Sequence, residues 1–416
     1  MNTRDFIKQI PPLAWVIMLT VLCAGIFGNL LGNLTSELSD DLHLSAKHIG
    51  WLVFIGSSGS ALGAFLGGDI AYRVRPLILV YVYLAGMLAS IMLLVSSTQF
   101  TTLAIGFLCY EIMLTALLTL SHTMIGQMDL TSAIRARMLA LLDVGWSVGA
   151  SIAPIWVVFL LRGYPSWRFP YALFILLVVA LIAAYSRKII RTSIDSIHLH
   201  RQPSTDEPSI QASHTYWQLI TSRWTIWAWV AAILIGYVEW GHTYWFVNYA
   251  HQGRDISLDN ARWGLLAFTA GMVLARAWQT FIHSHLSTEQ RLVRLSIVGC
   301  VMFALIAWFP NPTLMPYVLG TNFLAGVGIG IVFPILLNHL IDFAPHDTAK
   351  FSALLMLGIL MGAQLAGLII GNITEHSSIN WGYATIALAM FGFTFATLKL
   401  FAVHKQHPSF NTSSSN

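Results

Sequence analysis

The sequence predicts an all-α integral membrane protein with twelve transmembrane helices arranged as two bundles of six. Hydrophobic residues make up 56% of the chain and charged residues only 10%, whereas a soluble domain carries about 25% charged residues. The mean hydropathy is correspondingly high, at +0.69. Long apolar runs recur from end to end, and one long polar stretch divides them into two groups of equal number.

Each apolar run is long enough, or nearly so, to cross a bilayer, which takes about 20 residues. The first run is too long for the hydrophobic region of a signal peptide, so it is expected to be the first span. Charges and turn-forming residues separate the runs, as at Arg75-Pro76 and Pro310-Asn311-Pro312. The expected spans are 14–36, 47–71, 76–96, 100–128, 136–161, 169–186, 222–250, 259–282, 290–309, 314–341, 349–374 and 381–403.

The polar stretch 187–221 is rich in Arg, Ser, Thr, Pro and Gln and is predicted to be a mobile cytoplasmic linker. It separates an N-terminal six-helix bundle, 1–186, from a C-terminal one, 222–403, which a tail follows at 404–416. His198 and His200 in the linker have a spacing that metal ligands also use, but a solvated linker is the favoured interpretation.

The distribution of basic residues predicts the orientation. With both termini in the cytoplasm, five of the 22 Lys and Arg residues lie outside and the other 17 lie inside. Cytoplasmic loops of membrane proteins carry such an excess of Lys and Arg, and the even number of spans agrees with it. The five outside are Lys47, Arg162, Arg168, Arg254 and Arg262.

Several kinds of site are not expected. Cys23, Cys109 and Cys300 all lie in apolar runs, which predicts buried thiols rather than a disulfide framework or a metal site. The chain shows no phosphate-binding loop, so transport driven by ATP is not expected. It also shows no nucleophile–base pair or metal set, so it is not expected to be an enzyme or to use a cofactor. The pI near 9.0 follows from the excess of Lys and Arg in the cytoplasmic segments, so no nucleic-acid partner is expected. The expected partners are a small-molecule substrate, protons and the lipid bilayer, and the expected state is a monomer.

Two carboxylates lie where charge is unfavourable. Glu111 is within the run 100–128 and Glu239 within 225–249, each near the middle. An ionised acid at the bilayer centre costs roughly 2.5–3.5 kcal/mol on insertion scales, and burial favours the neutral form. Each acid could therefore couple transport to a proton or bind a polar solute. The alternative is a permanently neutral acid that joins two helices.

The twelve spans, the division into two groups of six and the basic central stretch resemble the major facilitator superfamily, in which two six-helix bundles enclose a site at the midplane. Locally, Glu239 is followed six residues later by Trp245 and then by Asn248-Tyr249, which resembles span seven of the fucose permease (sugar–proton symporter) family. The segments 268–276 and 326–334 are similar to spans eight and ten of that family. The N-terminal half looks closer to TsgA-like transporters, on the segments 125–128 and 135–139 and on Asp143, Gly149 and Pro154.

The sequence departs from these patterns in three places. The loop between spans two and three keeps Asp69, Arg73 and Arg75 but loses the spacing that is usual in the superfamily. Span one carries Asn29 and Asn33 where the fucose permease pattern has an acid. The Gly-Pro pattern of drug–proton antiporters is absent from span five. Coupling through a span-one acid is therefore not expected here.

The remaining candidate residues are polar or aromatic side chains at depth. His242 follows Glu239 by three residues, so the two could share one proton. Asp69, Arg73, Arg75, Asp143 and Arg276 lie towards the cytoplasmic ends of their spans, where salt bridges could form an inner gate. The expected substrate-binding residues are Asn29, Asn33, Glu111, Glu239, His242, Trp245, Asn338 and Gln364, of which Glu111 and Glu239 are also the expected proton-coupling groups.

No Lys or Arg is expected at midplane depth, which disfavours an anionic substrate. The sequence therefore predicts a secondary transporter in a bacterial-type inner (plasma) membrane that couples protons to symport of a small neutral polar solute such as a sugar or nucleoside. The alternative is a proton antiporter that exports a hydrophobic or cationic compound. A membrane sensor built on a transporter fold ranks below both, because no added signalling domain is visible.

Overall fold

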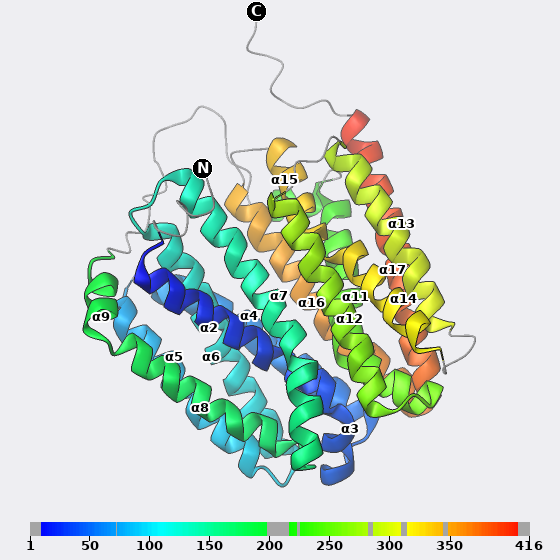
Figure 1. Ribbon diagram of the computed structural model, residues 1–416. Coiled ribbons are helices and arrows are strands. Elements are labelled where there is room, and N and C mark those ends of the chain that lie inside the picture. Colours follow the sequence, from blue (N-terminus) through cyan, green and yellow to red (C-terminus); the bar gives the residue numbers. More distant parts are fainter. Residues whose placement is uncertain are drawn as a thin grey trace, which may run out of the picture. The chain divides into compact units, whose positions relative to one another are not determined.

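The computed structural model is helical throughout the residues that it describes, which are 10–71, 73–197, 216–222, 225–281, 286–308, 314–343 and 348–406 (Figure 1). The chain divides into two compact units. Unit 1 contains residues 1–48 and 55–203, and unit 2 contains residues 49–54 and 204–416. Each unit is described by itself below.

Among the described residues, unit 1 contains eight helices. They are α2 (Pro12–Gly28), α3 (Leu30–Leu42), α4 (Ala46–Ile70), of which residues 49–54 are grouped with unit 2, α5 (Pro76–Ser96), α6 (Phe100–Gln127), α7 (Ser132–Gly163), α8 (Arg168–Tyr185) and α9 (Lys188–Asp195). Proline begins α2 and α5, where the missing N–H would have no helical partner in any case.

Unit 2 contains the other eight. They are α10 (Tyr216–Thr221), α11 (Ile226–Arg254), α12 (Leu258–Phe281), α13 (Thr288–Ala307), α14 (Met315–Ile329), α15 (Val332–Phe343), α16 (Thr348–His376) and α17 (Ile379–Gln406). Helix α11 packs mainly against α16 and α17, and α12 packs against α14.

Among the described residues, ten stretches are long and apolar enough to cross a membrane. They match all the predicted spans except 222–250 and 259–282, which correspond to α11 and α12. These two helices carry Glu239, Arg262 and Arg276 in addition to their apolar residues. The multi-pass helical architecture is therefore established, and the number twelve stays a prediction.

Two of the predicted spans are broken rather than continuous. The first bends at Asn29, which separates α2 from α3 and has non-helical backbone angles. The tenth is interrupted at Gly330 and Ile331, between α14 and α15. Broken helices place backbone carbonyl groups beside a site in many transporters, so both breaks are candidate site elements.

The predicted linker 187–221 is partly helical, because α9 and α10 lie inside it. Ile190 and Ile194 of α9 are buried, and the helix packs against α2, α5 and α8 of its own unit. The four-residue spacing of these two isoleucines gives a short helix one apolar face, which the overall polarity of the stretch conceals. His198 and His200 lie outside the described residues.

Glycines allow helices to cross closely in both units. A Cβ at Gly25 of α2 would overlap the backbone carbonyl of Trp146 in α7, and one at Gly149 of α7 would overlap that of Leu22. In unit 2, a Cβ at Gly362 of α16 would overlap the carbonyl of Ile233 in α11. Such contacts need residues without a side chain, and they are typical of helix pairs in membranes.

An arginine joins helix ends in each unit. Arg168, at the start of α8, pairs with Asp41 at the end of α3 and donates hydrogen bonds to the carbonyl groups of Val95 and Ser97 at the end of α5. Arg254, at the end of α11, donates to the carbonyl of Ala307 at the end of α13. Carbonyl groups at helix ends lack helical partners, and these guanidinium groups donate the missing hydrogen bonds.

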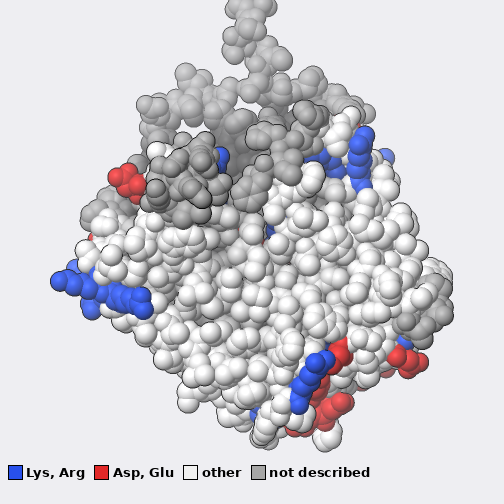
Figure 2. Space-filling view, in the orientation of Figure 1, with Lys and Arg blue, Asp and Glu red and all other residues white. Residues whose placement is uncertain are grey.

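Most charged side chains on the face shown in Figure 2 lie near the ends of the helices, and most of the surface along the helix middles is uncharged. Basic side chains gather over α9 (Figure 2), where Arg187, Lys188 and Arg191 are exposed. This distribution is typical of helices that pass through hydrocarbon, because charge is confined to the two interfaces.

Candidate functional site

Glu111 is buried inside unit 1 and is hydrogen-bonded to a serine of another helix. Its side chain lies on α6 and is 6% exposed, and the Ser60 hydroxyl of α4 donates to its Oε2 at 2.7 Å. Glycines bring the two helices together: a Cβ at Gly59 would come within 2.7 Å of the Leu108 carbonyl oxygen and 3.1 Å of the Glu111 Cβ. The sequence of α4 thus creates the space in which this carboxyl group lies.

The surroundings of Glu111 are otherwise aromatic and apolar. Its neighbour Tyr110 lies against Phe27 of α2, with ring centroids 4.1 Å apart, and Tyr171 of α8 lies close enough to feel the charge of the acid. In the part of the chain that the structure describes, no Lys or Arg pairs with Glu111. An ionised carboxylate without a counter-charge is costly in such surroundings, which makes Glu111 a candidate for a group that binds a proton.

Glu239, in contrast, has a cationic partner. Its Oε1 is 3.6 Å from a terminal guanidinium nitrogen of Arg276, and the two side chains are 23% and 22% exposed. The Arg276 Nε also donates to the backbone carbonyl of Gly330 at 2.9 Å. One guanidinium therefore joins α11, α12 and the break between α14 and α15.

This pairing bears on the expectation that no Lys or Arg lies at midplane depth, because it brings a guanidinium group to one of the two acids. Arg276 lies five residues before the end of α12 at Phe281. The Cα–Cβ bonds of a helix tilt towards its N-terminus, so a long side chain near the C-terminal end extends back towards the helix middle. The position of Arg276 in the sequence suggested the cytoplasmic end, whereas its side-chain nitrogen lies beside Glu239.

His242 does not share a proton with Glu239 in this structure. Its imidazole is fully buried, and its Nδ1 is 2.6 Å from the hydroxyl of Tyr383 in α17. The rings of Phe246 and Phe268 lie 4.7 and 4.2 Å from the imidazole, centroid to centroid. The two residues, three apart on α11, have different polar partners: Glu239 pairs with Arg276 of α12, and His242 with Tyr383 of α17.

Asn29 and Asn33 are buried in unit 1 and bind the backbone of their own span. The Asn29 Nδ2 donates to the Gly25 carbonyl, and the Asn33 Nδ2 donates to the Asn29 carbonyl, both at 2.8 Å. They therefore stabilise the bend between α2 and α3. The signal for this role was present in their four-residue spacing, which places each amide over the preceding turn.

The other expected substrate-binding residues differ in exposure. Trp245 is 1% exposed and lies within unit 2, while Trp240 stacks on Tyr244 with ring centroids 5.6 Å apart. Asn338 is exposed on α15, and Gln364 is half-buried on α16. Trp245 is thus a core side chain in this conformation, and Asn338 and Gln364 are the more accessible polar groups.

The five residues expected at an inner gate are only partly brought together. Asp143 of α7 lies 3.6 Å from the His122 Nε2 of α6, at a site where both side chains are substantially exposed. Arg73 and Arg75 are exposed beside the start of α5, and the side chain of Asp69 lies outside the described residues. Arg276 pairs with Glu239 and was expected at the gate instead.

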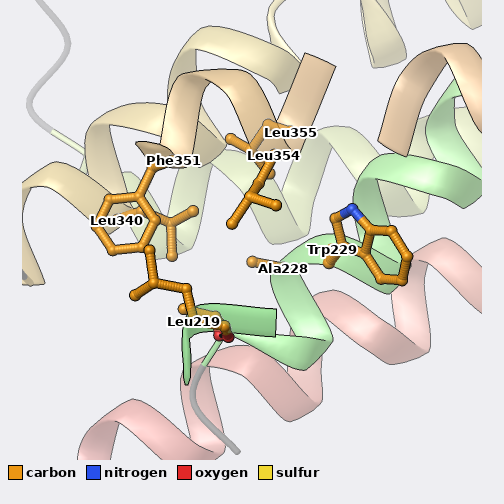
Figure 3. A pocket seen from close by; sticks show the side chains of 8 residues that line it. Leu219, Ala228, Trp229, Leu340, Phe351, Leu354 and Leu355 are labelled. Atoms are coloured by element: carbon orange, nitrogen blue, oxygen red, sulfur yellow. Dashed lines mark hydrogen bonds between the residues drawn. The ribbon is translucent and has the colours of Figure 1, made fainter. Parts of the chain in front are cut away.

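A small pocket in unit 2 does not include either carboxylate. Leu219, Ala228, Trp229, Leu340, Phe351, Leu354 and Leu355 line it, together with Thr225 (Figure 3). The labelled side chains that point into it are almost all apolar (Figure 3). Such a lining has few groups that could orient a hydroxylated solute, so we do not place the solute there.

Three partners of the site residues could not be predicted from the sequence. Ser60 is one serine among many, and the only local signal is its place in the glycine series of α4. Tyr383 and the carbonyl of Gly330 become partners only through packing between helices. A buried histidine or arginine in a membrane span indicates that a partner exists, but not which one.

The family model described as Major Facilitator Superfamily matches residues 17–354. Among curated proteins, none matches the sequence. The crystal structure of the nucleoside transporter NupG superimposes with a TM-score of 0.72 at 14% identity, over 94% of this chain and 99% of that one. A mutant of NupG superimposes with a TM-score of 0.73 at 14% identity, over 94% and 100%. These two likenesses show a shared fold.

Proposed function

Because the chain belongs to the major facilitator superfamily, we propose that it is a proton-coupled symporter of a small neutral polar solute, such as a sugar or nucleoside, that works by alternating access in an inner (plasma) membrane. The superfamily supplies the coarse conclusion that this is a transporter with a small-molecule substrate. Proton coupling, direction and solute class are proposed from the site.

The observation that carries the proposal is the environment of Glu111. Its carboxyl group is buried, accepts a hydrogen bond from Ser60 and pairs with no Lys or Arg of the described residues. A proton binds such a group when it opens to the side of higher proton concentration and leaves when it opens to the other side. A proton gradient then supplies free energy for solute uptake if the carrier changes state when it holds both the proton and the solute, or neither, but not when it holds only one of them.

The charge balance supports a neutral solute. Glu239 and Arg276 compensate one another, so this pair presents no net charge to a ligand. A singly charged solute would disturb that balance at a cost, because charges are poorly solvated at this depth. A neutral, hydroxyl-rich solute can hydrogen-bond to such groups without changing the net charge. NupG, whose name describes a nucleoside transporter, makes nucleosides a reasonable class to test first.

The proposal is tested by uptake into proteoliposomes that contain the purified chain, with an inward proton gradient. The probes are radiolabelled monosaccharides and nucleosides, and lipophilic cations serve as probes for the alternative of export. We expect wild-type protein to accumulate one of the neutral solutes above its external concentration, and to lose accumulation when the gradient is collapsed.

The variant E111Q separates coupling from binding. It replaces the carboxyl group by a neutral amide of similar size, which can still accept the Ser60 hydrogen bond but cannot exchange a proton. We expect E111Q to lose at least about tenfold in uphill accumulation, which corresponds to 1.4 kcal/mol of coupling, while solute exchange without a gradient continues. E375Q, which changes an exposed carboxylate at the end of α16, is the matched control. Normal accumulation by E111Q would refute the proposal.

A further inference from the structure

The tenth expected span carries a carbonyl group whose helical partner is missing. Helix α14 ends at Ile329, and the N–H of Gly330 still binds the carbonyl of Gly326. In a continuous helix, the carbonyl of Gly330 would accept a hydrogen bond from the N–H of the residue four positions on. That residue is Pro334, which has no N–H. The sequence itself therefore leaves the Gly330 carbonyl without its helical donor.

Arg276 supplies that donor from another helix. Its Nε donates to the Gly330 carbonyl oxygen at 2.9 Å. The two helices lie close at this point, since a Cβ at Gly330 would come within 2.9 Å of the Cα of Met272 on α12. A buried carbonyl group without a donor is unfavourable, so this hydrogen bond stabilises the break between α14 and α15.

The same guanidinium binds a group that can be protonated. A terminal nitrogen of Arg276 is 3.6 Å from the Glu239 Oε1. Helices α10, α12, α15, α16 and α17 pack against α11, and among their described titratable and charged groups Arg276 alone pairs with the Glu239 carboxylate. His242 on α11 itself faces Tyr383 instead. Protonation of Glu239 would therefore change the charge seen by one residue, Arg276.

From this geometry we propose that Arg276 is a positioning residue that couples the protonation state of Glu239 to the break in the tenth span. While Glu239 is charged, the ion pair holds the guanidinium in the orientation that also binds the Gly330 carbonyl. When Glu239 takes up a proton, that constraint weakens and the break becomes more mobile. This deepens the proposed function, on which it rests for its role in transport, because it names the element that responds to the proton.

Coupling between two sites is reciprocal. A solute that binds beside the break and holds it in one arrangement must also change the proton affinity of Glu239. Pro334 and Arg276 thus act together. The proline removes the helical hydrogen-bond donor to the Gly330 carbonyl, and Arg276 supplies another donor, whose position depends on the charge of Glu239.

The first test uses purified protein in lipid nanodiscs and needs no solute. Amide hydrogen exchange is measured for peptides covering residues 326–340 at pH values on either side of the Glu239 titration, with rates corrected for the intrinsic effect of pH. We expect wild-type exchange to be at least about fivefold slower at high pH, as a coupling of about 1 kcal/mol implies. E239Q should exchange fast at both pH values, and E375Q should behave as the wild type.

The second test restores the missing donor. P334A gives residue 334 an N–H that can bind the Gly330 carbonyl directly. R276Q alone should exchange fast at both pH values, and the double variant P334A/R276Q should exchange slowly at both. Should R276Q not fold, R276K keeps the charge but loses the planar fork that reaches two acceptors at once, and we expect it to abolish the pH dependence.

The outcomes separate this inference from the proposed function. If exchange of 326–340 does not depend on pH in the wild type, or if P334A fails to slow exchange in the arginine variant, the role of Arg276 is refuted whatever is transported. If instead E111Q accumulates solute normally while the exchange pattern is as expected, the symport proposal fails and the coupling of Glu239 to the break stands.

Discussion

Glu239 and His242 are three residues apart on one helix and yet belong to different networks. Three residues advance about 300° around an α-helix, which leaves about 60° between the two side chains. At a junction of several helices, 60° is enough for Glu239 to meet Arg276 on α12 and for His242 to meet Tyr383 on α17. Sequence spacing therefore indicates a shared face, whereas packing decides the partner.

The place of each acid near the middle of a long helix was predictable, because it follows from its place in an apolar run. Their partners were not, because Ser60 and Arg276 are brought to them by helix crossings that no local pattern specifies. The same limit explains His242, which we expected to bind substrate and which lies in the core of unit 2 instead.

Tyr383 should therefore matter for stability rather than for binding. In Y383F the ring remains and can still stack on Tyr249, whose centroid is 3.8 Å away, but the hydroxyl that meets the His242 Nδ1 is lost. A buried polar atom without its partner costs roughly 1–3 kcal/mol. We expect a lower apparent midpoint of thermal unfolding at a fixed scan rate, with unchanged solute affinity.

Y164F is the control for that measurement, because Tyr164 is 60% exposed and its loss of a hydroxyl should leave the midpoint unchanged. If Y383F instead binds solute more weakly and unfolds at the normal temperature, His242 belongs to the binding site, and its assignment to the core is wrong.

At the scale of elements, close glycine crossings recur on corresponding helix pairs of the two units. In unit 1 they join α2 to α7, and in unit 2 they join α11 to α16. Each is the first and the fifth expected span of its half. The crossings of α4 with α6 and of α12 with α14 likewise join the second and fourth spans, and they carry Glu111 and Arg276 respectively. Glycine content was visible in the sequence, but which glycines touch a backbone was not.

Two glycines of α14 provide a matched test of this packing. A Cβ at Gly326 would overlap the backbone carbonyl of Phe268 on α12, whereas one at Gly320 would meet nothing within 4 Å. Overpacking costs roughly 1–3 kcal/mol and more where the neighbour is backbone, while Gly to Ala in an open helical position gains up to about 1 kcal/mol. We expect G326A to lower the thermal midpoint and G320A to preserve or raise it.

Equal midpoints for the two alanine variants would mean that α12 and α14 are not held at the distance seen here.

The cause of the break in the tenth span is visible in the sequence, whereas the partner that stabilises the break is not. Gly330 and Pro334 are four residues apart, so a missing helical hydrogen bond could be predicted, but the identity of the replacement donor required the position of Arg276.

At the scale of the whole molecule, the polar residues that make α11 and α12 less apolar than the other spans are the residues that pair with one another. Glu239 on α11 and Arg276 on α12 form an ion pair, and the buried Arg262 lies 3.7 Å from Asp259. Consecutive helices that satisfy each other's charges can enter a membrane together at a lower cost than either alone, because an unpaired charge is the expensive species. The mean hydropathy of a single helix counts each charged residue as unfavourable and therefore misses this compensation.

The lengths of α11 and α12 agree with the interpretation that both helices cross the membrane. Helix α11 has 29 residues and α12 has 24, which at 1.5 Å per residue gives about 44 and 36 Å, against a hydrocarbon core of about 30 Å. If both helices cross, the turn between them lies on the same side as the turn between α7 and α8. If neither crosses, that turn lies on the side of α9, and the rest of the topology is unchanged.

Single cysteines distinguish the two arrangements, in a background where Cys23, Cys109 and Cys300 are replaced by serine. The positions are Ser257 between α11 and α12, Tyr164 after α7 and Ser196 after α9, all of which are exposed. Intact cells are treated with a membrane-impermeant maleimide, and then again after permeabilisation. We expect S257C and Y164C to react in intact cells and S196C to react only after permeabilisation, because twelve crossings with cytoplasmic ends place the first two outside. Reaction of S257C together with S196C would show that the helices bearing Glu239 and Arg276 do not cross, and would remove that pair from any path through the membrane.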